Sequence, residues 1–128
     1  MKSGVTKRIT LPAGREAVWR ALTISDLLSA WFGARVTIEA RLGGKSSFQW
    51  ADGRERSAVV EAFEPRRLLV LRWLPFERGP DGGSRIAPPG RIRLALEDDG
   101  SGTRLTVEET VGVATDRLEQ LMQLEGTR

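Results

Sequence analysis

The sequence of 128 residues contains no cysteine, no histidine and no tyrosine. Without cysteine there is no disulfide framework and no thiol chemistry, which fits a reducing compartment. Without histidine no side chain titrates near neutral pH in its unperturbed state, so acid–base catalysis would need a strongly shifted carboxylate or lysine. Both absences disfavour zinc and soft-metal sites. We therefore expect no catalytic residue, no metal and no cofactor. An enzyme is the less favoured interpretation.

Long hydrophobic runs are also absent. No segment approaches the ~18 apolar residues of a membrane span, and the first four residues lead into a strand pattern rather than into a signal sequence. The chain length is typical of one domain, whose hydrophobic core is large enough to be stable without disulfide bonds or bound metal. We therefore expect a single domain over residues 1–128, a cytoplasmic location and no association with membranes.

Massed charge of one sign is missing as well. The formal net charge is +3, and the basic residues are scattered along the chain. Arg66 and Arg67 form the only arginine doublet, and no RNA-binding, zinc-finger or basic-helix motif is present. A solvated basic surface is therefore the favoured interpretation, and we expect no nucleic-acid partner.

Periodicity predicts an α+β domain. A strand over residues 5–11 is followed by two short amphipathic helices that carry Trp19 and Trp31, the second of which ends at Gly33. A last helix is expected from Thr115. Alternation of apolar and polar residues predicts about six to seven strands in total, over residues 5–11, 35–42, 46–50, 56–64, 68–74, 91–97 and 103–109.

Two of these segments carry specific expectations. The segment 35–42 alternates without interruption, so Val36, Ile38, Ala40 and Leu42 are predicted to point into the core. Residues 75–90 are rich in glycine and proline and form a connection that is longer than usual. A mobile surface loop is the favoured interpretation of that connection, and a lid or a binding loop is the alternative.

Several of these stretches resemble bacterial homologues of the activator of the heat-shock-protein-90 ATPase. The matching stretches are residues 9–12, 18–23, 28–32, 52–53, 60–61, 65–73 and 102–107. The resemblance implies the START-like (SRPBCC) superfamily and its helix-grip fold, in which a C-terminal helix packs across a curved antiparallel sheet. No catalytic residue belongs to the matching motifs. The C-terminal helix looks short for the family, which makes a homodimer a further expectation.

A curved sheet closed by a helix encloses an apolar space, which favours a small hydrophobic or aromatic ligand. The residues expected to line that space are mainly large apolar side chains at inward-facing positions, together with two polar ones that could orient a ligand. They are Trp31, Phe32, Ile38, Phe48, Trp50, Arg72, Trp73, Leu94, Val107, Glu109, Leu118 and Met122.

The two polar candidates are Arg72 and Glu109. Glu109 shares the inward parity of Leu105 and Val107, and Arg72 lies between apolar neighbours. A buried pair of the two is one possibility, and ordinary exposure at the ends of strands is the favoured one.

Two other functions stay open at this point. The family resemblance suggests a protein-interaction domain with a chaperone as the partner. Other members of the superfamily suggest a polyketide cyclase or aromatase, which would need a polar group inside the cavity.

Overall fold

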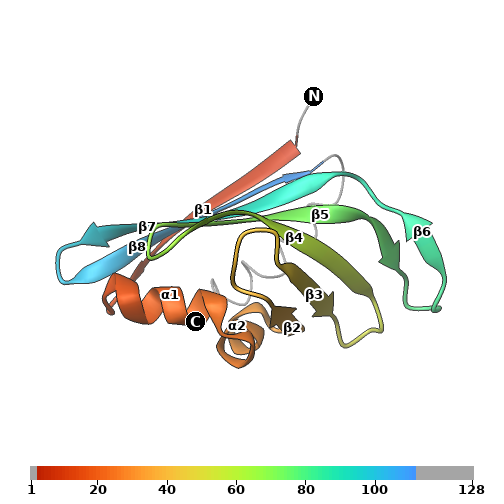
Figure 1. Cartoon of the computed structure of the whole chain (residues 1–128), viewed down its shortest axis with the longest axis horizontal. Coiled ribbons are helices and arrows are strands. Elements are labelled where there is room, and N and C mark those ends of the chain that lie inside the picture. The colour runs from red at the N-terminus through yellow and green to blue at the C-terminus, as the bar shows by residue number, and fades with distance from the viewer. Residues whose placement is uncertain (1–2, 112–128) are drawn as a thin grey trace.

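The computed structural model describes residues 3–111, and for Ser3, Trp31, Phe32 and Val111 it describes the backbone alone (Figure 1). Within this part of the chain, two helices follow the first strand and seven further strands complete a sheet. The helices are α1 (Arg15–Thr23) and α2 (Ser25–Phe32). The strands are β1 (Ser3–Leu11), β2 (Arg35–Ile38), β3 (Lys45–Gln49), β4 (Glu55–Glu64), β5 (Leu68–Arg78), β6 (Ser84–Ile86), β7 (Gly90–Asp99) and β8 (Gly102–Val111).

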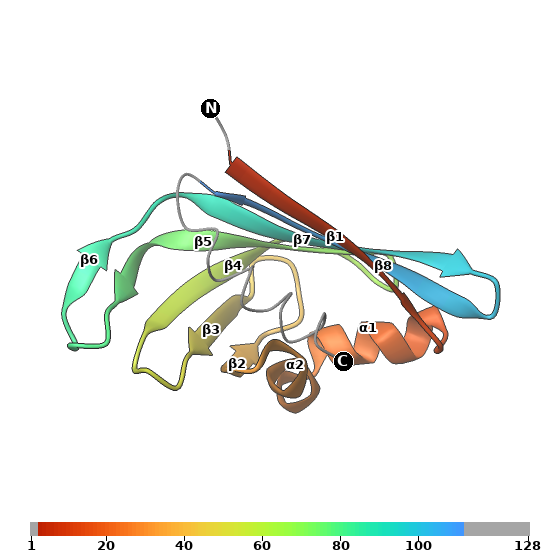
Figure 2. The same cartoon turned by 180° about the vertical axis from the view of Figure 1, so that it is seen from behind.

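All eight strands belong to one antiparallel sheet. Their order is β1-β8-β7-β5-β4-β3-β2, and β6 joins the sheet by pairing with β5. The sheet curls into a half-barrel, and both α1 and α2 lie on its concave side (Figures 1 and 2). This curled sheet with few helices is consistent with the START-like fold. The helix expected from Thr115 lies outside the described residues.

The helices form where the sequence predicts them. In α1 the apolar stripe Val18, Trp19 and Leu22 is buried, and Glu16 lies in the first turn, where the helix dipole favours a carboxylate. Gly33 ends α2 in the left-handed conformation, with φ of 69°, and its N–H donates to the carbonyl of Ser29 over 3.0 Å. Glycine adopts this conformation without a steric penalty.

The core is a layer of side chains on the concave face of the sheet. The register aligns Leu71 of β5 with Ile92 of β7, and Leu94 of β7 with Val107 of β8. Because side chains alternate along each strand, the apolar side chains aligned in this way all point to the face that the helices cover. The buried members of this layer and of the helices are Val18, Trp19, Leu22, Leu28, Val36, Phe48, Ala58, Val60, Leu69, Leu71, Trp73, Ile92, Leu94, Leu96, Leu105 and Val107.

The strand predicted over residues 35–42 is shorter in the structure. β2 ends at Ile38, and both Ala40 and Leu42 are exposed, so their predicted inward orientation is wrong. A tight loop replaces the end of the strand. In this loop the N–H of Gly43 donates to the carbonyl of Val60, and the N–H of Val60 donates to the carbonyl of Gly44. These bonds to β4 satisfy the backbone without continuing the strand.

Part of the connection over residues 75–90 is strand, at residues 75–78 and 84–86. β5 continues to Arg78, and the short strand β6 returns beside it, with Phe76 opposite Ile86. The prediction of a loop over the whole segment is therefore wrong for these strand residues, and β6 raises the strand count of the described residues to eight. Pro75 does not stop β5 because it lies beside a register shift in the β4–β5 ladder, where a missing N–H disturbs little.

No helix among the described residues is long and apolar enough to cross a membrane. That a single domain extends over all of residues 1–128 stays a prediction, because the structure describes residues 3–111.

Candidate ligand site on the concave face

Three aromatic side chains form a continuous row on the concave face. Phe48 of β3 is fully buried, and its ring contacts the edge of Trp73 on β5 at a centroid distance of 4.9 Å. On its other side Phe48 stacks on Trp50, with centroids 5.9 Å apart and ring planes 19° apart. Trp50 is only partly buried, so the row extends from the interior toward the end of β3. Such a wall suits an apolar or aromatic molecule.

A buried carboxylate interrupts the apolar face. Glu109 of β8 is only 3% exposed, and its Oε2 accepts a hydrogen bond from the indole N–H of Trp73 over 3.3 Å. The favoured prediction that Glu109 is exposed at the end of its strand is therefore wrong, because the alternation Leu105, Val107, Glu109 continues to the end of β8. A buried charge is costly without hydrogen-bond donors, and the indole of Trp73 supplies one.

Arg56 of β4 is the polar side chain that the sequence analysis missed. It is 2% exposed, and its guanidinium carbon lies 5.0 Å from the ring centroid of Trp73. Its Nη2 donates to the carbonyls of Leu74 and Pro88 over 3.1 and 2.7 Å. The sequence contains the signal for its position, because Arg56 shares the parity of the inward-facing Ala58 and Val60. Trp73 is thus held between a cation at its face and a carboxylate at its N–H.

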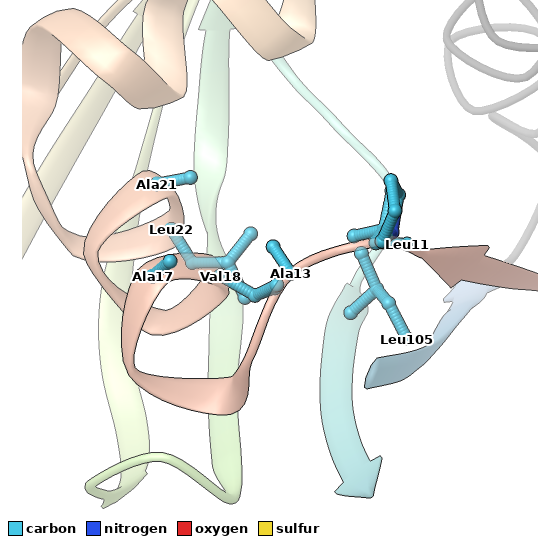
Figure 3. Close-up of a pocket in the computed structure, with 8 residues that line it drawn as sticks. Leu11, Ala13, Ala17, Val18, Ala21, Leu22 and Leu105 are labelled. Carbon is cyan, nitrogen blue, oxygen red and sulfur yellow. The ribbon is translucent and has the colours of Figure 1, made fainter. Parts of the chain in front are cut away.

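An apolar cavity of about 260 Å³ opens between α1 and the β1–β8 end of the sheet. The helix contributes small side chains at Ala17 and Ala21, and the sheet contributes Leu11 and Leu105 on the opposite side (Figure 3). Pro12, Ala13, Val18 and Leu22 complete the lining. None of these eight residues was predicted as a site residue. The available signal was the pair of alanines beside the apolar stripe of α1, where larger side chains would have filled the space.

The other predicted site residues fall into two groups. Leu94 and Val107 are buried in the concave face, and Ile38 is partly buried against the same core. The second group lies outside the described part of the structure. It consists of the side chains of Trp31 and Phe32 and of the residues Leu118 and Met122. The assignment of these residues to a ligand site therefore stays a prediction.

Arg72 lies on the opposite face of the sheet from Glu109. Its side chain is 44% exposed, and its Nε lies 3.3 Å from Oε1 of Glu61. Arg72 follows the alternation of β5, in which Leu71 and Trp73 point to the concave side. The possible ion pair between Arg72 and Glu109 does not form. The favoured prediction that both residues are exposed is correct for Arg72 and wrong for Glu109.

Among residues 3–111 no cluster of three or more acidic, histidine or cysteine side chains could hold a metal ion. The concave face of the described residues offers apolar volume, aromatic surface and a few fixed polar groups.

Several solved structures share this fold. Protein Mll3558 of Rhizobium loti is 23% identical, with a TM-score of 0.74 over 100% of this chain and 91% of its own. Protein MLL2253 of Mesorhizobium loti is 20% identical, with a TM-score of 0.73 over 94% and 97% of the two chains. DynU16, from the dynemicin biosynthetic locus, is 22% identical with a TM-score of 0.70, and the match covers 97% of this chain and 42% of DynU16. At these identities the likeness shows the fold.

No curated protein matches the sequence. The family described as "Activator of Hsp90 ATPase homolog 1-like protein" matches residues 12–127, which is nearly the whole chain. The curled sheet, the helix pair after the first strand and this match agree, and the chain belongs to that family.

Proposed function

We propose that the protein binds a small apolar or aromatic molecule on the concave side of its sheet. The observation that carries the proposal is the cavity of about 260 Å³ beneath α1, whose lining is almost entirely aliphatic. An apolar cavity of roughly 150 Å³ is already large enough to hold a benzene-sized molecule without water.

The cavity beneath α1 suits an apolar ligand, because none of its eight lining residues carries a polar side chain. Glu109 and Arg56 are buried beside Trp73, outside that lining, so they would orient only a ligand that extends along the concave face. In ligand pockets a few fixed polar groups set orientation while apolar surface supplies the affinity. A ligand of this size buries little area, so we expect affinities in the micromolar to millimolar range.

The test is a thermal-shift and NMR titration with small aromatics such as indole and naphthalene derivatives. Binding to the native state raises the melting temperature by mass action. The variant Ala21→Leu fills the cavity and should abolish the shift while the protein stays folded. The variant Ala40→Leu adds the same atoms at an exposed loop position and serves as the control.

A shift in the wild type and in Ala40→Leu, lost in Ala21→Leu, supports the proposal. No shift with any aromatic in the wild type, or an unchanged shift in Ala21→Leu, contradicts it.

A second function, an enzyme acting on a polyketide, is supported by the buried polar pair Arg56 and Glu109, because such an enzyme needs a polar group inside its cavity. The likeness to a protein of the dynemicin biosynthetic locus extends to the fold. Loss of turnover of an aromatic polyketide in Glu109→Gln would support this function, and ligand binding without turnover would contradict it.

The family name also keeps the chaperone interaction as a proposal. A rise in the ATPase rate of the bacterial chaperone on addition of this protein would support it, and an unchanged rate would contradict it.

A further inference from the structure

A second pocket opens where β5 changes its neighbour in the sheet. Residues 68–72 of β5 pair with β7, and residues 76–78 pair with β6. Between these two ladders residues 87–89 connect β6 to β7 without pairing as strand, and the N–H of Ala87 donates to the carbonyl of Pro75 over 2.8 Å. The gap forms a pocket of about 440 Å³, a size found in small-molecule sites.

The walls of this pocket are mostly apolar and fixed in place. Pro75, Ile86, Ala87 and Pro89 contribute to them. From the concave side, Arg56 donates to the carbonyl of Leu74 on one wall and to that of Pro88 on the other. Proline restricts the backbone, and the two bonds from one buried guanidinium hold the walls at a set distance. The pocket is therefore pre-formed, which lowers the entropic cost of binding.

The rim of the pocket is positively charged. Arg72 and Arg91 both line it, and they are directly opposite each other in the β5–β7 ladder. Like charges in this position repel, and Glu61 relieves the repulsion by pairing with both. Its hydrogen bond from Arg91 is the main reason that the pKa of Glu61 lies below its ordinary value. Two guanidiniums share one carboxylate, which leaves one positive charge in excess.

Both arginines retain capacity for a further anion. A guanidinium carries five N–H donors, and Arg72 contacts Glu61 through Nε. The side chains of Arg72 and Arg91 are 44% and 54% exposed, so a ligand in the pocket can reach them. Guanidinium and carboxylate groups match in geometry, and such bonds are stronger than neutral ones.

We propose that this pocket binds an amphipathic monocarboxylate, with its apolar body between the proline walls and its carboxylate on Arg72 and Arg91. The site is separate from the cavity beneath α1, since the two share no lining residue. Trp73 of the aromatic row also lines this pocket, but the proposal does not depend on the cavity beneath α1 that carries the proposed function.

The test is an NMR titration of the whole chain with octanoate, and with 1-octanol as the neutral ligand of similar shape. Octanoate should shift the amide signals of Ala87 and Gly90, and Arg72→Gln should weaken its binding about tenfold, the usual effect of losing a charge-assisted hydrogen bond. Arg78→Gln is the matched control, because Arg78 also lies on β5 and pairs with a single glutamate but does not line the pocket.

A second variant protects the test against effects on folding. Ile86 is 81% exposed, so Ile86→Ser removes apolar wall without disturbing the core, and it should weaken both octanoate and 1-octanol. Ala21→Leu should leave octanoate binding unchanged, which distinguishes this pocket from the cavity beneath α1.

Equal weakening in Arg72→Gln and Arg78→Gln would overturn the proposal, because it would show binding to surface charge in general. Shifts confined to α1, or octanoate binding no tighter than that of 1-octanol, would overturn it as well.

Discussion

Replacing Trp73 with phenylalanine removes the indole N–H that donates to the buried carboxylate of Glu109. The bond is 3.3 Å long, and the two side chains are 4% and 3% exposed, so little water is at hand to replace the donor. A hydrogen bond to a charged group contributes about 1.5–3 kcal/mol. The smaller ring also leaves unfilled volume in the core. We expect a loss of about 2–4 kcal/mol in the free energy of unfolding, of which the larger part is the lost bond.

Trp19→Phe is the control that separates the two contributions. Trp19 is buried to a similar degree, at 7% exposed, and its ring packs on Phe63 at 5.4 Å. The substitution therefore removes the same atoms from another buried indole, away from Glu109. The assay is urea unfolding followed by far-UV circular dichroism, which does not depend on tryptophan fluorescence.

The double variant Trp73→Phe/Glu109→Gln completes a thermodynamic cycle. A neutral amide tolerates burial better than a carboxylate, so Glu109→Gln should cost less in the Trp73→Phe background than in the wild type. Our reasoning is refuted if Trp73→Phe costs no more than Trp19→Phe, or if the two changes at Trp73 and Glu109 are additive.

Three further predictions follow from single contacts. The pKa of Glu61 is lowered, chiefly by its hydrogen bond from Arg91, so its contribution to stability is present above pH 4.5, its ordinary pKa, and is lost as the pH falls through the folded value. The melting temperatures of the wild type and of Glu61→Gln should therefore converge at low pH. A constant difference down to pH 2 would contradict this. Gly44→Ala should lower the free energy of unfolding in urea by at least about 1–3 kcal/mol, because the added Cβ would lie 2.1 Å from the carbonyl oxygen of Glu39. An unchanged free energy of unfolding would contradict the tight loop. Arg56→Met should cost about 1–3 kcal/mol in urea unfolding, because the part-buried carbonyls of Leu74 and Pro88 lose their donor. A variant as stable as the wild type would show that water replaces it.

Much of the site could be predicted from local patterns. The inward orientation of Phe48, Trp73, Leu94 and Val107 follows from strict alternation, because successive side chains of a strand point to opposite faces. The same rule points Glu109 inward, but the sequence analysis favoured its exposure because a carboxylate in a core is uncommon. The rule also applies to Arg56, which the sequence analysis overlooked because arginine is rarely buried.

Other features depend on contacts between distant segments. Alternation over residues 35–42 predicted a strand to Leu42, but hydrogen bonds with β4 end β2 at Ile38. The glycines and prolines of residues 75–90 predicted a loop, but pairing with β5 makes part of it a strand. In both segments the backbone found partners that local sequence does not encode.

The sequence by itself determined which residues of each strand share a face, where the two short helices begin and end, and that the interior would be apolar and aromatic. These properties follow from the fixed periods of strand and helix and from local steric rules. Only the tertiary structure decided which strands pair, where β5 exchanges β7 for β6, and where the side chains of α1 and the sheet fail to meet. Pockets are differences between packed volumes, so they exist only once segments far apart in the chain have come together.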